Sequence, residues 1–171
     1  TDYSAFGIPT QNPRVVKGRA GSPYAITDYY DIDPDIVVDV DARMAEFEAL
    51  IARTHAEGMK VIIDFVPNHV ARQYKSIAKP KGVEDLGEGD DTGKHFDPQN
   101  NFYYCPGEQL DLSGVVENVY AHDAEAYHEY PAQCTGHYRF YSHPQQNYWY
   151  ETIKLNYGVD LSLIPISAPT R

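Results

Sequence analysis

The chain has 171 residues, of which 42% are hydrophobic and 23% are charged, a balance typical of globular proteins rather than disordered chains. Its 14 Lys and Arg against 25 Asp and Glu give a net charge of −11. This charge repels nucleic-acid phosphates and anionic lipid surfaces, so we expect no nucleic-acid partner and no membrane partner. The first residues show no targeting segment, and the sequence leaves the cellular compartment unknown.

Residues 1–40 have the composition of loops. Glycine and proline interrupt short polar stretches throughout this region, and both residue types favour turns over regular elements. Two tyrosine-containing segments stand out within it, Ser22-Pro23-Tyr24 and Asp28-Tyr29-Tyr30. A tyrosine ring offers a flat apolar face with a polar tip, which suits stacking on a sugar ring, although partial burial in the core would explain most tyrosines equally well.

The region from residue 41 to residue 58 has the clearest periodicity. Apolar residues recur there at three-to-four spacing, which predicts an amphipathic helix with one buried stripe: Met44, Phe47, Leu50 and Ile51. Asp41 is the expected N-cap of this helix. Gly58 stands where the residue after a helix takes a positive φ.

Residues 61–66 form an almost unbroken apolar run, Val61-Ile62-Ile63-Asp64-Phe65-Val66. Such a run predicts a parallel strand that is covered on both faces, as in doubly wound α/β folds and in (β/α)₈ barrels. This unit alone does not separate the two architectures. The polar residues Asn68 and His69 follow at the carboxyl end of the strand, where both architectures build their active sites.

Residues 70–160 are acidic, aromatic and rich in turn signals, and they are too numerous for an ordinary connection between strand and helix. We expect a small inserted domain that is irregular and contains short strands such as Ile153–Tyr157. Cys105 and Cys134 could pair in an oxidising compartment or remain thiols, and the sequence leaves both possibilities open.

The motif Asp64-Phe65-Val66-Pro67-Asn68-His69, after a helix, a glycine and an apolar run, resembles the first short signature of glycoside hydrolase family 13, the α-amylases. The tyrosine-containing segments of residues 22–34 resemble that family's loop before the second barrel helix. Segments 101–104 and 149–160 also look like this family, although they are less diagnostic. Four matches in the same order make a coincidence in an unrelated α/β domain a weak competitor.

The resemblance implies the α/β class: a fragment of a TIM (β/α)₈ barrel with an inserted irregular α+β domain B. Residues 1–69 would supply part of the barrel, with its second helix and third strand, and residues 70–160 would be domain B. Residues 161–171 do not match the family, and a truncation or a sequence-assembly artefact is our preferred interpretation of this tail.

The resemblance also implies roles for matched positions. His69 resembles the histidine that hydrogen-bonds the sugar next to the scissile bond, and Tyr24 resembles the aromatic residue that stacks on that sugar. Asn68 resembles the amide whose oxygen binds a structural Ca²⁺, a cation that selects oxygen ligands. Asp64 resembles an aspartate that supports the substrate site. Without the family context, Asn68 and His69 would be read as a turn, and Tyr24 and Asp64 as structural residues.

The implied activity is retaining hydrolysis of α-glucosidic linkages in starch, glycogen, maltodextrin or a related α-glucan or maltooligosaccharide. Retaining glycosidases need two carboxyl groups about 5–5.5 Å apart, and in this family they follow domain B. We therefore expect no catalytic residue in this chain and no activity from the chain alone. Alternatives are an α-glucosyl transferase or isomerase of the same fold, and a non-catalytic carbohydrate-binding or transporter-associated homologue.

Overall fold

The computed structural model describes residues 2–116, 118–137 and 140–160. The described residues contain one α-helix, α1 (Arg43–Ala56), and four short strands, which are β1 (His69–Ala71), β2 (Tyr104–Cys105), β3 (Ala132–Gln133) and β4 (Thr152–Lys154). Single 3₁₀ turns lie at Ser4–Phe6, Pro13–Val15, Pro34–Ile36 and Val119–Ala121. Among these residues, no helix has the length and apolar character needed to cross a bilayer.

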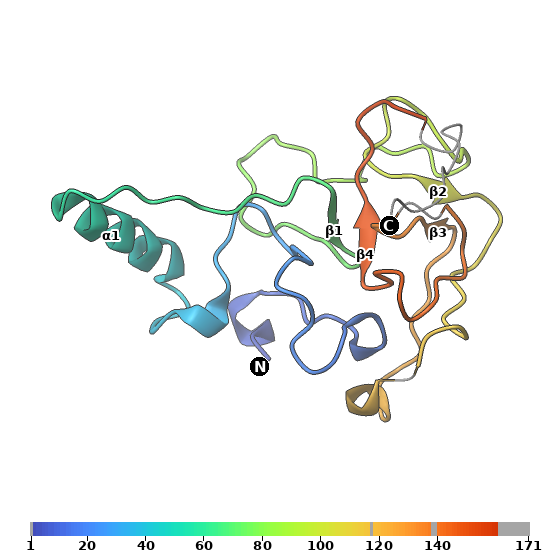
Figure 1. Ribbon diagram of the computed structural model, residues 1–171, viewed down its shortest axis with the longest axis horizontal. Coiled ribbons are helices and arrows are strands. Elements are labelled where there is room, and N and C mark those ends of the chain that lie inside the picture. Colours follow the sequence, from blue (N-terminus) through green and yellow to red (C-terminus); the bar gives the residue numbers. More distant parts are fainter. Residues whose placement is uncertain (1, 117, 138–139, 161–171) are drawn as a thin grey trace, which may run out of the picture.

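The strands form two antiparallel pairs, β1 with β4 and β2 with β3. In the first pair His69 lies opposite Lys154 and Val70 lies opposite Ile153. The two pairs are joined at their ends, because the amide of Lys154 donates to the carbonyl of Cys134 at 2.9 Å. Figure 1 shows α1 at one end of the molecule, away from the strands and joined to β1 by an extended segment.

The core lies around the strands and consists of two clusters. One contains Val70, Phe102, Tyr104, Ile153 and Leu155, and the other contains Tyr103, Cys105, Leu110, Ala132 and Cys134. Successive residues of an extended chain point to opposite sides. The segment 102–105 therefore contributes alternate side chains to both clusters and holds them together.

The two cysteines, whose state the sequence left open, are neighbours in the second cluster. Cys105 and Cys134 are both buried and both free, and their Sγ atoms lie 3.7 Å apart. The contact with the Cys105 sulfur and burial both raise the pKa of the Cys134 thiol. In this structure the pair is two thiols in contact within an apolar cluster.

Arg72, directly after β1, links three segments of this core. Its buried guanidinium donates to the carbonyls of Tyr150 (2.7 Å), Gln133 (3.1 Å) and Thr152 (3.3 Å). It also forms an ion pair with Glu129, in which Nη1 and Oε1 are 2.6 Å apart. A buried charge is tolerated when it is paired and hydrogen-bonded in this way.

The predicted helix forms, but two details of the prediction are wrong. Ala42, rather than Asp41, is the N-cap residue, and it makes no side-chain capping bond. A side chain of the helix caps the preceding loop instead: the Glu46 carboxylate accepts hydrogen bonds from the amides of Val38 and Asp39. Gly58 ends the helix with φ +73°, as expected.

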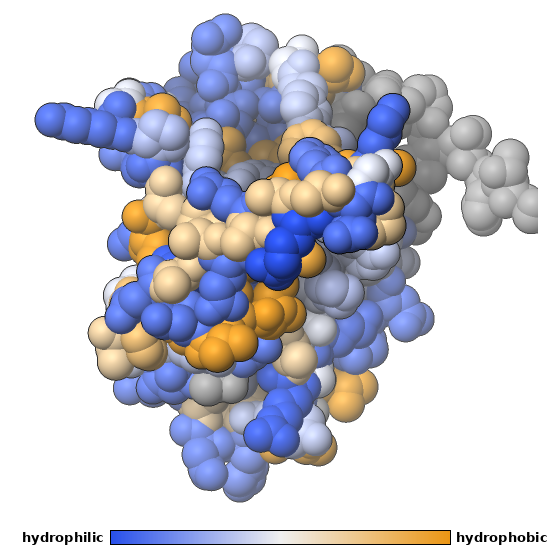
Figure 2. Space-filling model, turned by 90° about the vertical axis from the view of Figure 1, so that its left-hand side faces the viewer, coloured by the Kyte–Doolittle hydropathy of each residue, from blue (hydrophilic) through white to orange (hydrophobic). Residues whose placement is uncertain are grey.

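The predicted buried stripe of α1 is also wrong in this structure. No residue of α1 is fully buried, and Met44 and Leu50 are exposed. The reason is that residues 61–66, the predicted strand against which the helix was expected to pack, do not form a strand. Figure 2, which faces the side that carries α1, shows apolar residues open on this surface.

The parallel strand predicted at residues 61–66 does not form. The segment is extended but unpaired, and its apolar side chains are exposed, with Ile62 at 94% and Phe65 at 70%. A strand exists only through hydrogen bonds to a neighbouring strand, and no described residue pairs with this run. Consequently no barrel is visible, and the strands that do form are short and antiparallel.

The strand predicted at Ile153–Tyr157 appears in part, as β4. It ends at Lys154, and Leu155 makes only an isolated bridge to Phe102. The tail, residues 161–171, lies outside the described residues.

Replacing Arg72 by methionine should strongly destabilise the protein. The change leaves the largely buried Glu129 carboxylate without its charge partner and removes one donor from each of three carbonyls, a loss of about 3–5 kcal/mol. Denaturant unfolding measures it. Lys79→Met is the matched control, because its ion pair with Glu88 is exposed and should contribute about 0–1 kcal/mol. Equal stability losses in the two variants would contradict this role of Arg72.

Candidate functional site

A buried carboxylate positions the loop that carries Tyr24. Glu151 lies just before β4, and its Oε2 accepts hydrogen bonds from the amides of Lys17 (3.0 Å) and Ser22 (3.2 Å). The Ser22 hydroxyl in turn accepts from the amide of Tyr24 at 3.2 Å. A fourth bond, from the Ala71 amide to the Ile26 carbonyl (2.8 Å), fixes the loop beside β1.

Asn68 and His69 are held by a continuous set of hydrogen bonds. Asn68 Oδ1 accepts a hydrogen bond from Lys154 Nζ. Asn68 Nδ2 lies 3.0 Å from the Gly136 carbonyl and 2.8 Å from His69 Nδ1. An ammonium group only donates, so the amide atom that faces Lys154 must be the oxygen. Nδ2 therefore donates to His69 Nδ1, and in the neutral ring the proton lies on Nε2.

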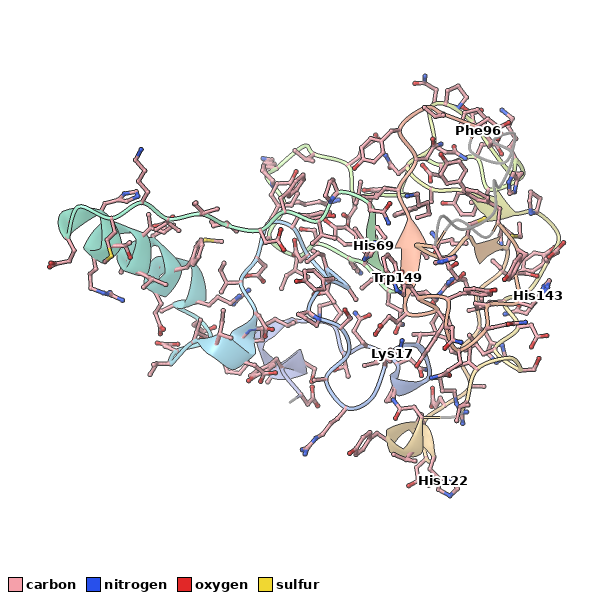
Figure 3. All side chains as sticks on the ribbon, viewed as in Figure 1. Lys17, His69, Phe96, His122, His143 and Trp149 are labelled. Carbon is pink, nitrogen blue, oxygen red and sulfur yellow. The ribbon has the colours of Figure 1, made fainter. Side chains whose placement is uncertain are left out.

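The His69 imidazole is buried, and its surroundings favour the neutral form. Burial lowers the pKa of His69, the backbone carbonyl of Tyr24 raises it, and the nearby charge of Lys154 lowers it, with a net decrease. The Trp149 ring lies 4.9 Å from the imidazole, centre to centre, and is 44% exposed. Figure 3 shows His69 and Trp149 side by side next to β1 and β4.

The structure brings three of the four predicted site residues together. Asn68 and His69 are bonded to each other, and the backbone of Tyr24 reaches the imidazole, while the Tyr24 ring is 54% exposed. Asp64 is not part of this group. It lies in the extended segment before Asn68, is exposed, and makes no hydrogen bond to another described residue.

Two residues of this site, Trp149 and Lys154, were not singled out from the sequence. Both come from the far end of the chain and reach His69 through the antiparallel pairing of β1 with β4. A single tryptophan in a tyrosine-rich segment was the available signal. The pairing itself is non-local, so the spacing of residues could not reveal it.

Tyrosine hydroxyls fix the backbone on which Asn68 and His69 lie. Tyr29 donates to the carbonyl of Val66, and Tyr157 donates to the carbonyl of Pro67. The two rings also line a cavity of about 240 Å³ together with Phe65. Aromatic walls of this kind suit the apolar faces of sugar rings.

The groups around Asn68 do not suit the Ca²⁺ expected there. The amide oxygen that would bind the cation already accepts from the Lys154 ammonium. Within residues 2–116, 118–137 and 140–160, no three His, Cys, Asp or Glu side chains gather in a group that could hold a metal ion. Since Ca²⁺ takes six to eight oxygen ligands, these residues do not fit it.

Gly136→Ala should damage the site by steric overlap. A Cβ at residue 136 would lie 2.3 Å from Thr152 Oγ1 and 2.8 Å from His69 Cβ, closer than atoms approach without displacement. Overpacking of this kind costs about 1–3 kcal/mol. Thermal unfolding measures the loss. Gly89→Ala is the control, because its new Cβ meets only a Glu84 carboxylate oxygen at 3.6 Å, and a loss as large as that of Gly136→Ala would refute the steric explanation.

Comparisons with known proteins agree on one family. The family model "Alpha amylase, catalytic domain" matches residues 11–156, well over half of the chain. Maltase 1 of Drosophila virilis is 42% identical over 67 residues, which is 37% of this chain and 10% of that protein. Cyclomaltodextrin glucanotransferase of Bacillus sp. (strain 17-1) is 35% identical over 83 residues, 45% of this chain and 11% of that protein.

A longer alignment relates the chain to the amino acid transporter heavy chain SLC3A1 of Mus musculus, with 28% identity over 131 residues, 73% of this chain and 16% of that protein. The chain thus spans between 10% and 16% of the length of these three relatives. No solved structure matches it. The match over residues 11–156 shows that the chain belongs to the α-amylase catalytic-domain family.

Proposed function

We propose that the protein acts on α-glucosidic linkages of starch, glycogen or maltodextrin by a retaining mechanism, and that this chain supplies part of its sugar-binding site. Family membership and relatives named as maltases and an α-glucosidase support a glycosidase. The observation that carries the proposal is the imidazole of His69, held by Asn68 beside the exposed ring of Trp149.

The geometry suits recognition of one glucosyl unit. The apolar face of a pyranose ring can lie on Trp149 or on the exposed ring of Tyr24. Its hydroxyl groups can then accept a hydrogen bond from the His69 Nε2 proton. A neutral ring is the useful form, because it donates without adding a full charge to a buried site.

The catalytic groups and the sugar-binding groups are different residues in this proposal. A retaining glycosidase needs one carboxylate as nucleophile and one carboxylic acid as proton donor. We assign neither role to a described residue, and Asp64 supports the site only through the backbone that leads to Asn68. In our proposal, residues 1–69 belong to the barrel and residues 70–160 form domain B, whose Trp149 completes the sugar site.

In the full-length protein, His69→Ala should lower kcat/KM for maltooligosaccharides about 10²-fold. The imidazole is proposed to bind the sugar more tightly in the transition state, and removing one such donor costs about 2.7–4 kcal/mol elsewhere. Initial rates on maltotriose provide the measurement. His122→Ala is the matched control, since His122 is exposed and lies far from His69 in Figure 3. Near-normal kcat/KM for the His69 variant would refute the proposal.

A transferase or isomerase of the same family is the alternative supported by the similarity to a cyclomaltodextrin glucanotransferase. Hydrolysis and transfer share the glycosyl-enzyme step and differ in the acceptor. Product analysis of the full-length protein on maltooligosaccharides and on sucrose separates them. Glucose and shorter oligosaccharides alone indicate hydrolysis, whereas longer or isomeric products indicate transfer.

A non-catalytic role is the second candidate, because the alignment with a transporter heavy chain covers 73% of this chain. This role predicts no turnover of any α-glucoside by the full-length protein. Calorimetry with maltotriose then distinguishes a retained sugar site, whose binding is lost in the His69→Ala variant, from a site that no longer binds sugar.

A further inference from the structure

The side chain of Lys154 points into the structure rather than away from it. Lys154 lies opposite His69 in the β1–β4 pair, and its Nζ is bonded to Asn68 Oδ1. Among the described residues, Lys154 forms no ion pair with a carboxylate. Its ammonium group donates to the amide oxygen of Asn68.

This contact and the Gly136 carbonyl favour the same orientation of the Asn68 amide. With the oxygen directed at the ammonium, both amide hydrogens face the other way, toward the Gly136 carbonyl and His69 Nδ1. A flipped amide would direct Nδ2 at the ammonium, donor against donor, and Oδ1 at the Gly136 carbonyl, acceptor against acceptor. Lys154 therefore contributes, through the Asn68 amide, to the proton position on His69.

The same contact bears on the metal. A divalent cation at Asn68 Oδ1 would have to displace the ammonium or lie against it, at a distance where like charges repel strongly in a partly buried site. It would also need further oxygen ligands, which the described carboxylates do not supply as a cluster. A lysine is a compact point charge on a flexible stem and can reach such a position from a neighbouring strand.

We propose that Lys154 is a positioning residue for His69, and that its ammonium takes the place at Asn68 that the family resemblance assigns to Ca²⁺. The cation of this site is then covalently part of the chain. It aligns the Asn68 amide, and through it the imidazole, without any dependence on free metal. The effect on catalysis rests on the proposed function, whereas the metal independence and the proton position do not.

The first test measures metal dependence without activity. The melting temperature of the full-length protein should be the same in Ca²⁺ and in EGTA, and Lys154→Met should not change this insensitivity into dependence on added Mg²⁺ or Na⁺. A clear rise in the wild-type melting temperature on adding Ca²⁺, with a bound ion at Asn68 in a crystal structure, would overturn the replacement of metal by lysine.

The second test follows the proton on His69. In protein labelled with ¹⁵N-histidine, with His69→Ala to assign the signal, wild-type His69 should show the Nε2–H tautomer. Lys154→Met should shift the signal toward a mixture of tautomers, Lys154→Arg should restore the wild-type pattern, and Lys94→Met, on an exposed side chain, should leave it unchanged. An unaltered His69 signal in Lys154→Met would overturn the positioning role.

The third test separates this inference from the proposed function. Lys154→Met should lower kcat for maltotriose about tenfold with a smaller change in KM, and Lys154→Arg should recover part of the loss. A wild-type protein without turnover would remove the proposed function while leaving the first two tests in force. Full activity of Lys154→Met together with a normal His69 signal would remove the inference alone.

Discussion

The rest of the structure depends on the hydrogen bonds and the ion pair of the buried Arg72 guanidinium. Most of this chain lacks regular secondary structure, and its strands contain two or three residues each. Such strands are marginal by themselves. Arg72 compensates by bonding to the carbonyls of Tyr150, Gln133 and Thr152 and by pairing with Glu129. It thereby fixes the segment before β4 against the end of β1, and this alignment puts Lys154 opposite His69.

The carboxylates of Glu129 and Glu151 then organise the loops around Arg72. Glu129 Oε1 accepts from the Gln133 amide as well as from Arg72, and Glu151 binds the two amides that fix the Tyr24 loop. A carboxylate can accept several hydrogen bonds at once. One such side chain can therefore bind backbone amides that would otherwise be paired with a neighbouring strand. The site is therefore assembled by side-chain-to-backbone bonds between distant segments, and those of Glu151 to Lys17 and Ser22 join residues 134 and 129 positions apart.

Apart from the N-cap of α1, local signals in the sequence predicted local structure well, and the remaining errors come from non-local contacts. The spacing of residues 41–58 predicted α1 and the positive φ of Gly58, and the Asn68-His69 motif predicted the family. The run at 61–66 was expected to be a buried strand, since in a barrel such a run is paired on both edges. The described residues provide no partner for it, and α1 loses its cover for the same reason. Trp149 and Lys154 escaped notice because only the β1–β4 pairing brings them to His69.

The backbone that leads to Asn68 and His69 is held in place although residues 61–66 form no strand. The carbonyls of Val66 and Pro67 would otherwise bond to neighbouring strands, and here the hydroxyls of Tyr29 and Tyr157 take that role. From Asn68 onward the backbone is held by β4, beginning with the bond from the Leu155 amide to the Asn68 carbonyl. The orientation of His69 is thus set by Asn68, which is held in turn by Gly136 and Lys154. Substitutions at residues 61–63 should therefore alter the position of the His69 imidazole mainly through the contacts of Tyr29 and Tyr157.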